Sequence, residues 1–471
     1  MQNIAIAGLG PHARHSYYPI FERASHGGQN SIKLVIDLED QRSLISDYIA
    51  RHAVKPESTV YLDVSRRGDS ILGPDIRDIL DSIHQRDRLH KLLVAAEPRA
   101  HKGYVLWALK NNVDVAIEKP LTATTLDTMD PDSPAILLRD YEEIESIAIP
   151  SRSRAVLMAP RRRHAGYRLI RDYLSKFVAE FGIPITYLDI YHADGVCNLP
   201  EEFHSRENHP YKYGYGKLMH SGYHHIDLFM WLIQVNRASA DRDVKKVELS
   251  TRHVSARDLI RQIGVDSYQK LFPAREHAAY FAPAKLEGAD QFGETDVCVL
   301  VQLKSEEAVI TTGSINLLQT SLSQRAWPEL RDPIYNKSTG RVTRERLTVQ
   351  VGHLLNIEAN LHPVTVNEPA NVYEARQENR FDITICRNAA LVGGPAFEKI
   401  SLPGMTAPNE ARTETGLLRR AREEIVTLWL DGLTTASELQ THRDTIKMLA
   451  KIYECMFRQN CGLSPMTDFH F

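Results

Sequence analysis

The chain of 471 residues has few of the features that mark membrane, secreted or metal-binding proteins. It has only five cysteines, and none of them forms a C-x-x-C pair: Cys197, Cys298, Cys386, Cys455 and Cys461. An odd, sparse set without metal-ligand spacing favours reduced thiols in a cytoplasmic protein. Because no run of about 18 apolar residues occurs, we expect no membrane-spanning helix. The first residues lack a basic segment, so we expect no signal peptide.

Neither sign of charge dominates the sequence. Lys and Arg number 57 against 60 Asp and Glu, which gives a formal net charge of -3 and favours neither nucleic acid nor an anionic membrane as a partner. Hydrophobic residues make up 43% and charged residues 25%, as in soluble globular proteins. The length predicts two domains rather than one. We find no internal repeat and no low-complexity tract.

A glycine-rich turn directly follows the first predicted strand, residues 4–7. The next six residues read G-x-G-x-x-A and open a helix: Gly8, Leu9, Gly10, Pro11, His12 and Ala13. A strand before the motif and a helix after it are the context of a dinucleotide-binding turn. Gly8 permits the tight turn, Gly10 lets the backbone approach a pyrophosphate, and Ala13 permits close packing. Unpaired N–H groups at the helix start would then face the phosphates, although a plain glycine turn is the alternative.

An acidic residue ends the second predicted strand. Residues 32–36 form that strand, and Asp37 follows it. A carboxylate there accepts hydrogen bonds from the adenosine ribose and repels a 2′-phosphate, which favours NAD over NADP. The interval from Gly8 to Asp37 is longer than usual, and Arg42 lies near, so NADP is not excluded.

Glu118, Lys119 and Pro120 follow a further apolar run. The runs 92–96 and 113–117 are short enough for buried strands, with a helix between them. Alternating strands and helices predict a parallel sheet. A lysine at the end of such a strand lies at the crevice where open α/β sheets bind ligands, whereas most lysines are simply solvated.

Two histidines distinguish the second part of the chain. His220 and His224 are four residues apart, so they share one face of a predicted helix, and Asp227 can orient His224. A zinc helix is the alternative, but the glutamate of H-E-x-x-H is missing and no third ligand is evident, so we predict no metal site. We expect His225 to pack at a domain interface.

Residues 185–192 alternate in polarity, and later runs resemble strands of an antiparallel sheet, followed by two amphipathic helices. The predicted strands are residues 185–192, 244–249, 297–303, 309–315, 347–351 and 357–361, and the helices are 417–433 and 439–457. Segments 256–292 and 322–345 show no clear periodicity and are predicted insertions.

These motifs resemble the glucose-fructose oxidoreductase / inositol dehydrogenase / MocA (Gfo/Idh/MocA) family of NAD(P)-dependent oxidoreductases. The matching segments are residues 8–13, Asp37, 96–101, 108–121, 156–163 and 220–227. The resemblance implies an N-terminal Rossmann domain, 1–155, and an α+β C-terminal domain, 156–471, with a large, mainly antiparallel open sheet and C-terminal helices at about 413–460. Three residues depart from the family pattern: Glu97 replaces threonine, Arg161 replaces asparagine, and His220 replaces aspartate.

The resemblance also implies a reaction and a set of site residues. The reaction is hydride transfer between NAD(P) and a secondary alcohol or ketone of a sugar, cyclitol or related compound. The implied catalytic residues are Lys119, His220 and His224. The implied cofactor-binding residues are Gly8, Leu9, Gly10, Pro11, His12, Ala13, Asp37, Ala96, Glu97, Pro98, His101, Glu118 and Lys119. The implied substrate-binding residues are Lys119, Arg161, Tyr191, His220, Tyr223 and His224.

Each catalytic role has a chemical reason. An imidazole has an ordinary pKa of about 6.5, so His224 suits the general base, with His220 in support. The Lys119 ammonium can hold the reacting oxygen. Two alternatives remain: an NAD-binding regulator without catalysis, and a redox-cycling lyase or glycosidase with tightly held NAD. The family further implies a homodimer or homotetramer formed through the C-terminal sheet.

Overall fold

The computed structural model divides the chain into two units, each described here by itself. It describes residues 2–28, 30–123, 131–194, 198, 200–207, 209–239, 244–264, 266–267, 270, 288–306, 308–321, 344–365, 377–404 and 416–471. Most of the two predicted insertions, residues 271–287 and 322–343, lies outside these ranges. The first unit comprises Met1–Thr124, Ile136–Arg163 and Leu418–Ile446, and the second comprises Thr125–Ala135, His164–Leu417 and Lys447–Phe471.

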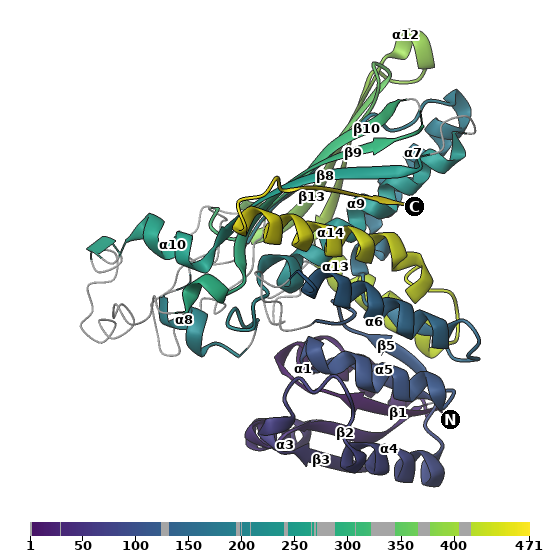
Figure 1. Ribbon diagram of the computed structural model, residues 1–471. Helices are drawn as coiled ribbons and strands as arrows, with labels where there is room; N and C mark the ends of the chain where they lie inside the picture. The colour runs from purple at the N-terminus through teal and green to yellow at the C-terminus, as the bar shows by residue number, and fades with distance from the viewer. Residues whose placement is uncertain are drawn as a thin grey trace. The chain divides into compact units, whose positions relative to one another are not determined.

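A six-stranded parallel sheet is the framework of the first unit (Figure 1). Its order, β3-β2-β1-β4-β5-β6, is that of a doubly wound dinucleotide-binding sheet. The strands are β1 (Gln2–Ala7), β2 (Asn30–Leu38), β3 (Ser58–Leu62), β4 (Lys91–Val94), β5 (Asp114–Ile117) and β6 (Ala155–Leu157). All of β4 is buried, as expected for a strand covered on both faces. The strand order reverses at β1 and β4, so ligands of such sheets bind beyond the carboxyl ends of these two strands.

The helices of the first unit include one from the distant end of the chain. They are α1 (Pro11–Ser16), α2 (Tyr18–His26), α3 (Arg42–Ala50), α4 (Pro74–Asp87), α5 (His101–Lys110), most of α6 (Ser133–Ala148), and α13 (Gly416–Leu430). Ile425, Val426 and Trp429 of α13 belong to the same buried cluster as Ile4 and Phe21. Each fully buried side chain of this size contributes about 1.5–3 kcal/mol. This packing assigns residues 418–446 to the first unit, which differs from the predicted division at residue 155.

A nine-stranded sheet is the framework of the second unit. Its order is β14-β13-β12-β11-β7-β10-β9-β8-β15, and every neighbouring pair is antiparallel except β7 with β10. The strands are β7 (Tyr187–Ala193), β8 (Lys246–Ser255), β9 (Glu294–Lys304), β10 (Val309–Leu318), β11 (Arg344–Val351), β12 (Leu355–Thr365), β13 (Gln377–Arg387), β14 (Phe397–Gly404) and β15 (Met466–His470). The predicted mainly antiparallel sheet is therefore confirmed, and β13, β14 and β15 add strands that the periodicity did not predict.

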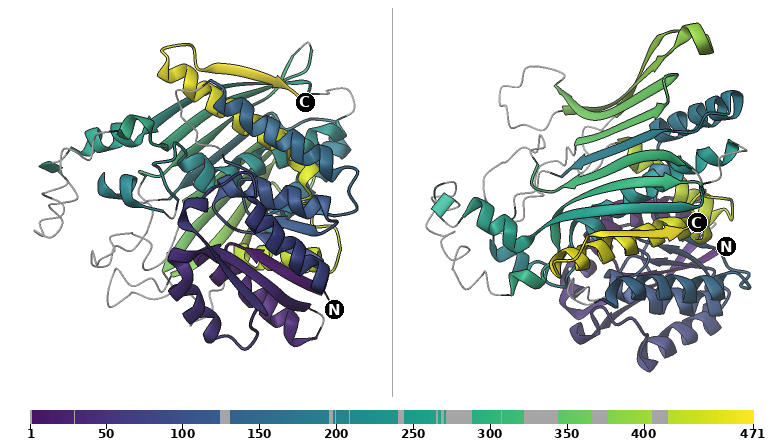
Figure 2. Two further views of the ribbon diagram at one scale, coloured as in Figure 1. Left: turned by 60° about the horizontal axis from the view of Figure 1, so that its bottom comes forward. Right: turned by 45° about the horizontal axis from the view of Figure 1, so that its top comes forward.

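Helices cover one face of this sheet. Figure 2 (right) shows the strands of the sheet from the side of a face. The helices lying wholly or mostly in this unit are α7 (Ala165–Phe181), α8 (Pro200–Ser205), α9 (Tyr223–Ile233), α10 (Ala256–Ile263), α12 (Ala389–Val392) and α14 (Arg443–Asn460). In β9 the side chains alternate: Val299 and Val301 are buried, whereas Cys298 and Leu300 are exposed. The period of two therefore places a core on one face of the sheet only.

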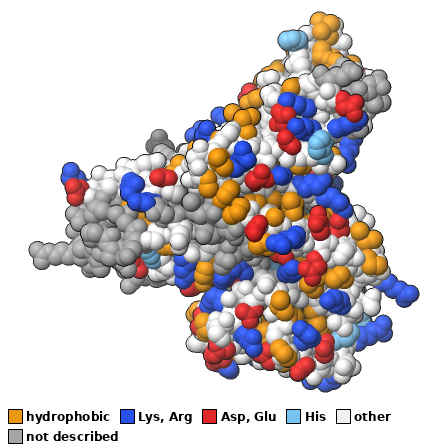
Figure 3. Space-filling model, in the orientation of Figure 1, with side chains coloured by type: hydrophobic (Ala, Val, Ile, Leu, Met, Phe, Trp, Pro, Cys, Tyr) orange, Lys and Arg blue, Asp and Glu red, His pale blue; other side chains and the backbone are white. Residues whose placement is uncertain are grey.

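The described surface is mixed in charge. Figure 3 shows basic and acidic side chains interspersed over the face in view, in keeping with the net charge of -3. Among the described residues, no helix combines the length and the apolarity needed to cross a bilayer.

Candidate active site

The glycine-rich turn of the first unit has the geometry that the sequence predicts. Gly8 has φ +90°, and a Cβ on it would stand 2.4 Å from the backbone nitrogen of Ala96. Among the described residues other than its neighbours along the chain, no atom lies within 4 Å of a Cβ placed on Gly10, which caps α1. Ala13 is buried. The turn is therefore closed at Gly8 and open at Gly10, the position where a pyrophosphate would approach.

Asp37 lies against this turn. Its Oδ2 accepts a hydrogen bond from the Leu9 backbone nitrogen at 2.6 Å, and its Oδ1 accepts one from Leu38 at 2.7 Å. Burial raises the pKa of Asp37 against the opposing effect of these two bonds. Arg42 donates through Nε and Nη2 to both carboxylate oxygens of Glu39, at 2.6 and 2.7 Å. Since Arg42 is bound in this way, the arrangement favours a free ribose hydroxyl beside Asp37.

Glu118 connects the turn to Lys119. Its Oε1 accepts a hydrogen bond from Tyr17 and lies 3.1 Å from His12 Nε2, and its Oε2 accepts one from the Lys119 backbone nitrogen at 3.0 Å. Burial opposes ionisation, but His12, Arg422 and Lys119 outweigh it and hold the pKa of Glu118 well below its ordinary value. Glu118 is thus a buried anion that fixes the backbone of Lys119. Through His12, Glu118 therefore also contacts the turn of residues 8–13.

His101 has a different role from the predicted one. The ring is fully buried, with Nδ1 3.0 Å from the Pro120 carbonyl oxygen and Nε2 3.0 Å from the Ala96 carbonyl oxygen. Because both ring nitrogens face backbone oxygens, His101 presents no polar atom to a cofactor and instead ties two loops together. Nearby, Glu97 accepts hydrogen bonds from the backbone and side chain of Arg99, around the short helical turn that Pro98 begins.

In the second unit, the histidine pair lies on a π-helical turn that leads into α9. The turn spans Leu218–Gly222 and carries His220, and His224 is the second residue of α9. Such turns are rare and are frequent at functional sites. The His220 ring makes edge contacts with Tyr211 and His209, at centroid distances of 4.8 and 5.0 Å. Both histidines of the pair are partly exposed.

The structure describes the surroundings of the three other predicted substrate residues. Tyr223 is fully buried, so its ring packs in the core. Tyr191 bonds Ser321 at 2.6 Å and stacks with Arg346, on the face of the sheet opposite its strand neighbour His192. Arg161 is buried in the first unit.

The two arginines that follow Arg161 have structural roles. Arg162 donates to Thr441 Oγ1 at 2.5 Å and to the Thr441 carbonyl at 3.1 Å, and Arg163 donates to the Thr435 carbonyl at 2.8 Å. This segment therefore holds the loop that follows α13.

Glu294 is a residue that sequence reasoning missed. It is fully buried at the start of β9, and its Oε1 accepts a hydrogen bond from the Leu218 backbone nitrogen at 2.7 Å. That nitrogen belongs to the first turn of the π-helical segment, and N–H groups of a first turn have no hydrogen-bond acceptor within the helix. Burial raises the pKa of Glu294 to about 7. No pattern in the sequence pairs residue 294 with residue 218, since the contact depends on tertiary packing.

Replacing Glu294 with glutamine should change how stability depends on pH. The ordinary pKa is 4.5, so between pH 4.5 and 7 the folded protein binds more protons at this site than the unfolded chain does. The stabilisation from this carboxyl is complete below pH 4.5 and is lost as the pH rises through 7. Glutamine keeps the acceptor for Leu218 and does not titrate. Relative to the native protein, E294Q should therefore gain up to about 3 kcal/mol in unfolding free energy between pH 4.5 and 8. Urea unfolding at both pH values measures this; an equal difference at both would contradict it.

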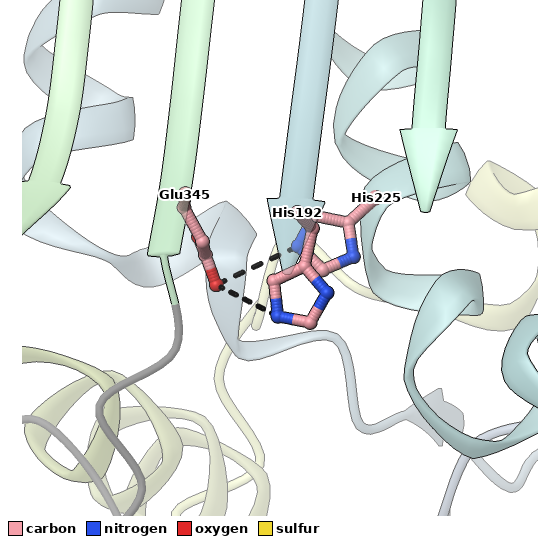
Figure 4. Close-up of side chains that lie close together, drawn as sticks. All are labelled: His192, His225 and Glu345. Atoms are coloured by element: carbon pink, nitrogen blue, oxygen red, sulfur yellow. Dashed lines mark ion pairs between the residues drawn. The ribbon is translucent and has the colours of Figure 1, made fainter. Parts of the chain in front are cut away.

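His225, predicted to pack at a domain interface, is buried against His192 and Glu345 of its own unit (Figure 4). The imidazole of His192 lies 4.1 Å from that of His225, centroid to centroid. The sequence did not predict this contact, because Glu345 lies more than a hundred residues from His225 along the chain.

Comparisons with known proteins support the fold. No family model and no curated protein matches the chain. An oxidoreductase from Agrobacterium radiobacter, solved with NAD+, L-tartaric acid and magnesium, is 14% identical, with a TM-score of 0.56 over 100% of this chain and 98% of that one. The WlbA dehydrogenase from Bordetella pertussis, solved with NADH and UDP-GlcNAcA, is 12% identical, with a TM-score of 0.53 over 100% and 98%.

A third solved structure has a similar fold. The aldose-aldose oxidoreductase from Caulobacter crescentus, solved with glycerol, is 12% identical, with a TM-score of 0.53 over 100% of this chain and 99% of that one. At such identities the likeness establishes the fold alone. It confirms the predicted Rossmann domain joined to an α+β domain with a large, mainly antiparallel sheet, and it agrees with the family resemblance of the motifs.

Proposed function

We propose that the protein is an NAD-dependent oxidoreductase that transfers a hydride between the nicotinamide and a secondary alcohol or ketone of a sugar, cyclitol or related compound. The observation that carries the proposal is the turn at Gly8, where the Asp37 carboxylate binds Leu9 N–H and the Gly10 position stays open. These residues fit a dinucleotide with a free ribose hydroxyl. Similar structures were solved with NAD+ or NADH, and one with NADP, so they support a dinucleotide and leave the choice between the two cofactors to Asp37.

The chain's own residues have distinct proposed tasks. A bound nicotinamide would supply the hydride chemistry. Lys119 would hold the substrate oxygen through its ammonium, which favours loss of the hydroxyl proton. His224 would accept that proton, with His220 in support. Glu118 would position Lys119 through the hydrogen bond to its backbone nitrogen.

We also propose a substrate class, an oligomeric state and a cellular location for the protein. A small sugar-like substrate agrees with the ligands of similar structures, UDP-GlcNAcA and glycerol. The family resemblance supports a homodimer or homotetramer formed through the large sheet. The sparse cysteines support a cytoplasmic location.

The deciding experiment mixes the purified protein with NAD and a panel of polyols, aldoses, cyclitols and amino sugars, and follows the nicotinamide absorbance. Reduction with any panel member supports the dehydrogenase. Persistent NAD binding without any reduction would favour the regulator. Product formation without net reduction, from cofactor that survives purification, would favour the redox-cycling lyase or glycosidase.

Replacing Asp37 with asparagine should relax the cofactor preference. Asparagine keeps an oxygen for Leu9 N–H but loses the negative charge that binds ribose hydroxyls and repels a 2′-phosphate. We expect the ratio of NAD affinity to NADP affinity to fall roughly tenfold or more, since hydrogen bonds to charged groups contribute about 1.5–3 kcal/mol. Fluorescence titration with each cofactor measures the ratio. Arg42→Ala is the matched control and should leave it unchanged; a larger effect in that variant would refute the assignment.

A further inference from the structure

Three side chains that commonly bind metals meet inside the second unit. His192 on β7 and Glu345 on β11 are directly opposed across two paired strands, and His225 on α9 points toward both (Figure 4). One ligand atom from each residue lies within 4.8 Å of the other two. The side chains of His192, His225 and Glu345 are only 3%, 1% and 5% exposed. Burying polar side chains costs free energy unless each of them contacts a hydrogen-bonding group, a charge or a metal ion.

The distances fit ligands around one ion better than hydrogen bonds. Glu345 Oε1 lies 3.5 Å from His225 Nε2 and 3.9 Å from His192 Nε2, and Asp194 Oδ1 lies 3.5 Å from His192 Nε2. An N–H···O hydrogen bond spans about 2.7–3.2 Å. Two nitrogen or oxygen ligands of a tetrahedral zinc ion, each at about 2.0–2.1 Å, stand roughly 3.3 Å apart. If the three side chains moved slightly closer together, their ligand atoms would therefore stand at the distances found between zinc ligands.

Contacts behind these side chains orient them toward a common point. His225 Nδ1 lies 3.3 Å from the Ser221 carbonyl oxygen, which favours a proton on Nδ1 and leaves the Nε2 lone pair facing Glu345. Tyr167 donates to the other carboxylate oxygen of Glu345 at 2.8 Å. A backbone carbonyl behind the imidazole and a donor behind the carboxylate are the usual outer contacts of metal ligands.

The charge of the cluster also favours a cation. Lys217 Nζ lies 3.0 Å from His192 Nδ1 and forms an ion pair with Asp194. Around the two imidazoles, the carboxylates of Asp194 and Glu345 outnumber the one ammonium, Lys217, by a single negative charge. Coordination through His192 Nε2 requires the proton on Nδ1, so Lys217 would then bind Asp194 alone.

We propose that His192, His225 and Glu345 bind one divalent ion of the zinc type, for which two imidazoles and a carboxylate are suitable ligands. Because the ligands are buried, the ion would have a structural role: it would join α9, which carries His224, to strands β7 and β11. This site departs from the prediction that no metal binds, which was based on the cysteine spacing and on the pair His220 and His224. The site does not depend on the proposed NAD chemistry.

The test measures metal binding directly. The full-length protein is purified without added metal, its metal content is measured, and after chelator treatment it is titrated with Zn²⁺ and with Co²⁺. We expect one equivalent of Zn²⁺ per chain, a visible Co²⁺ absorption band, and a melting temperature that falls with chelator and recovers with Zn²⁺. Tyr167→Phe should weaken affinity by about 10- to 100-fold, the range for loss of an outer contact.

Substitutions locate the site. His225→Gln and Glu345→Gln should abolish the Co²⁺ band, whereas His220→Gln and His224→Gln should retain it. If a variant of the cluster does not fold, the change in melting temperature of the native protein with chelator and with Zn²⁺ still tests whether a metal binds. No bound metal, no Co²⁺ band and an unchanged melting temperature would overturn the proposal and leave the cluster as an ion-pair network. Loss of the band in the His220 or His224 variants would move the metal to the other histidine pair and would equally overturn it.

Discussion

Replacing Lys119 with alanine should lower turnover by about 10²- to 10⁴-fold and leave NAD binding largely intact. The substitution removes the ammonium that we propose holds the reacting oxygen. It does not remove the support of the loop, because Glu118 binds the backbone nitrogen of residue 119 rather than its side chain. Turnover is measured with the panel compound that the native protein oxidises fastest, and NAD affinity by fluorescence titration.

Two further variants make this result specific. Lys110→Ala, at the exposed end of α5, removes a lysine from the same unit and should leave turnover unchanged. Lys119→Arg keeps the charge but changes its shape and reach, so it should recover only a small part of the activity. Native turnover in Lys119→Ala would rule out the assignment, as would a loss of NAD binding equal to the loss of turnover.

Alanine at Gly8 should lower the stability of the protein, whereas alanine at Gly10 should weaken NAD binding and leave the stability nearly native. At Gly8 the backbone has φ +90°, and the added Cβ would meet the backbone of Ala96 at 2.4 Å, where neither side can move easily. A strained backbone costs about 1–3 kcal/mol and overpacking a further 1–3 kcal/mol, so the unfolding free energy should fall by roughly 2–6 kcal/mol.

At Gly10 the same change meets open space and a backbone conformation that alanine adopts readily, with φ -65° and ψ 178°. Gly10→Ala should fold with nearly native stability, yet bind NAD roughly tenfold more weakly or worse, a change of about 1.4 kcal/mol. Its Cβ would stand where the pyrophosphate must approach. Urea unfolding and NAD titration of both variants provide the comparison. Equal NAD affinity in Gly10→Ala and the native protein would argue against a dinucleotide at this turn.

Local patterns in the sequence determined a large part of the fold. Apolar runs of four to six residues predicted β1, β4 and β5, alternation predicted β7, and strand-like runs predicted β9 and β10, because side-chain burial follows the period of the backbone. The turn at residues 8–13 and Asp37 could likewise be predicted, since each depends on a few neighbouring residues at the end of a strand. Strand β3 was missed, because its five residues are only partly buried.

Other features required contacts that no local pattern contains. The helix α13 packs with the N-terminal sheet because Trp429 and its neighbours complete a core more than 400 residues away in sequence from β1. His101 became a structural residue because two backbone carbonyls enclose its ring.

The sequence by itself thus determined the doubly wound first sheet, the mainly antiparallel second sheet and the glycine turn, since periodicity and turn chemistry act over short distances along the chain. Only the tertiary structure decided that Glu294 supports the helix of His220, and that His192 and His225 share Glu345. Such contacts join residues that strand pairing and helix packing bring together, and their sequence separation leaves no periodic trace.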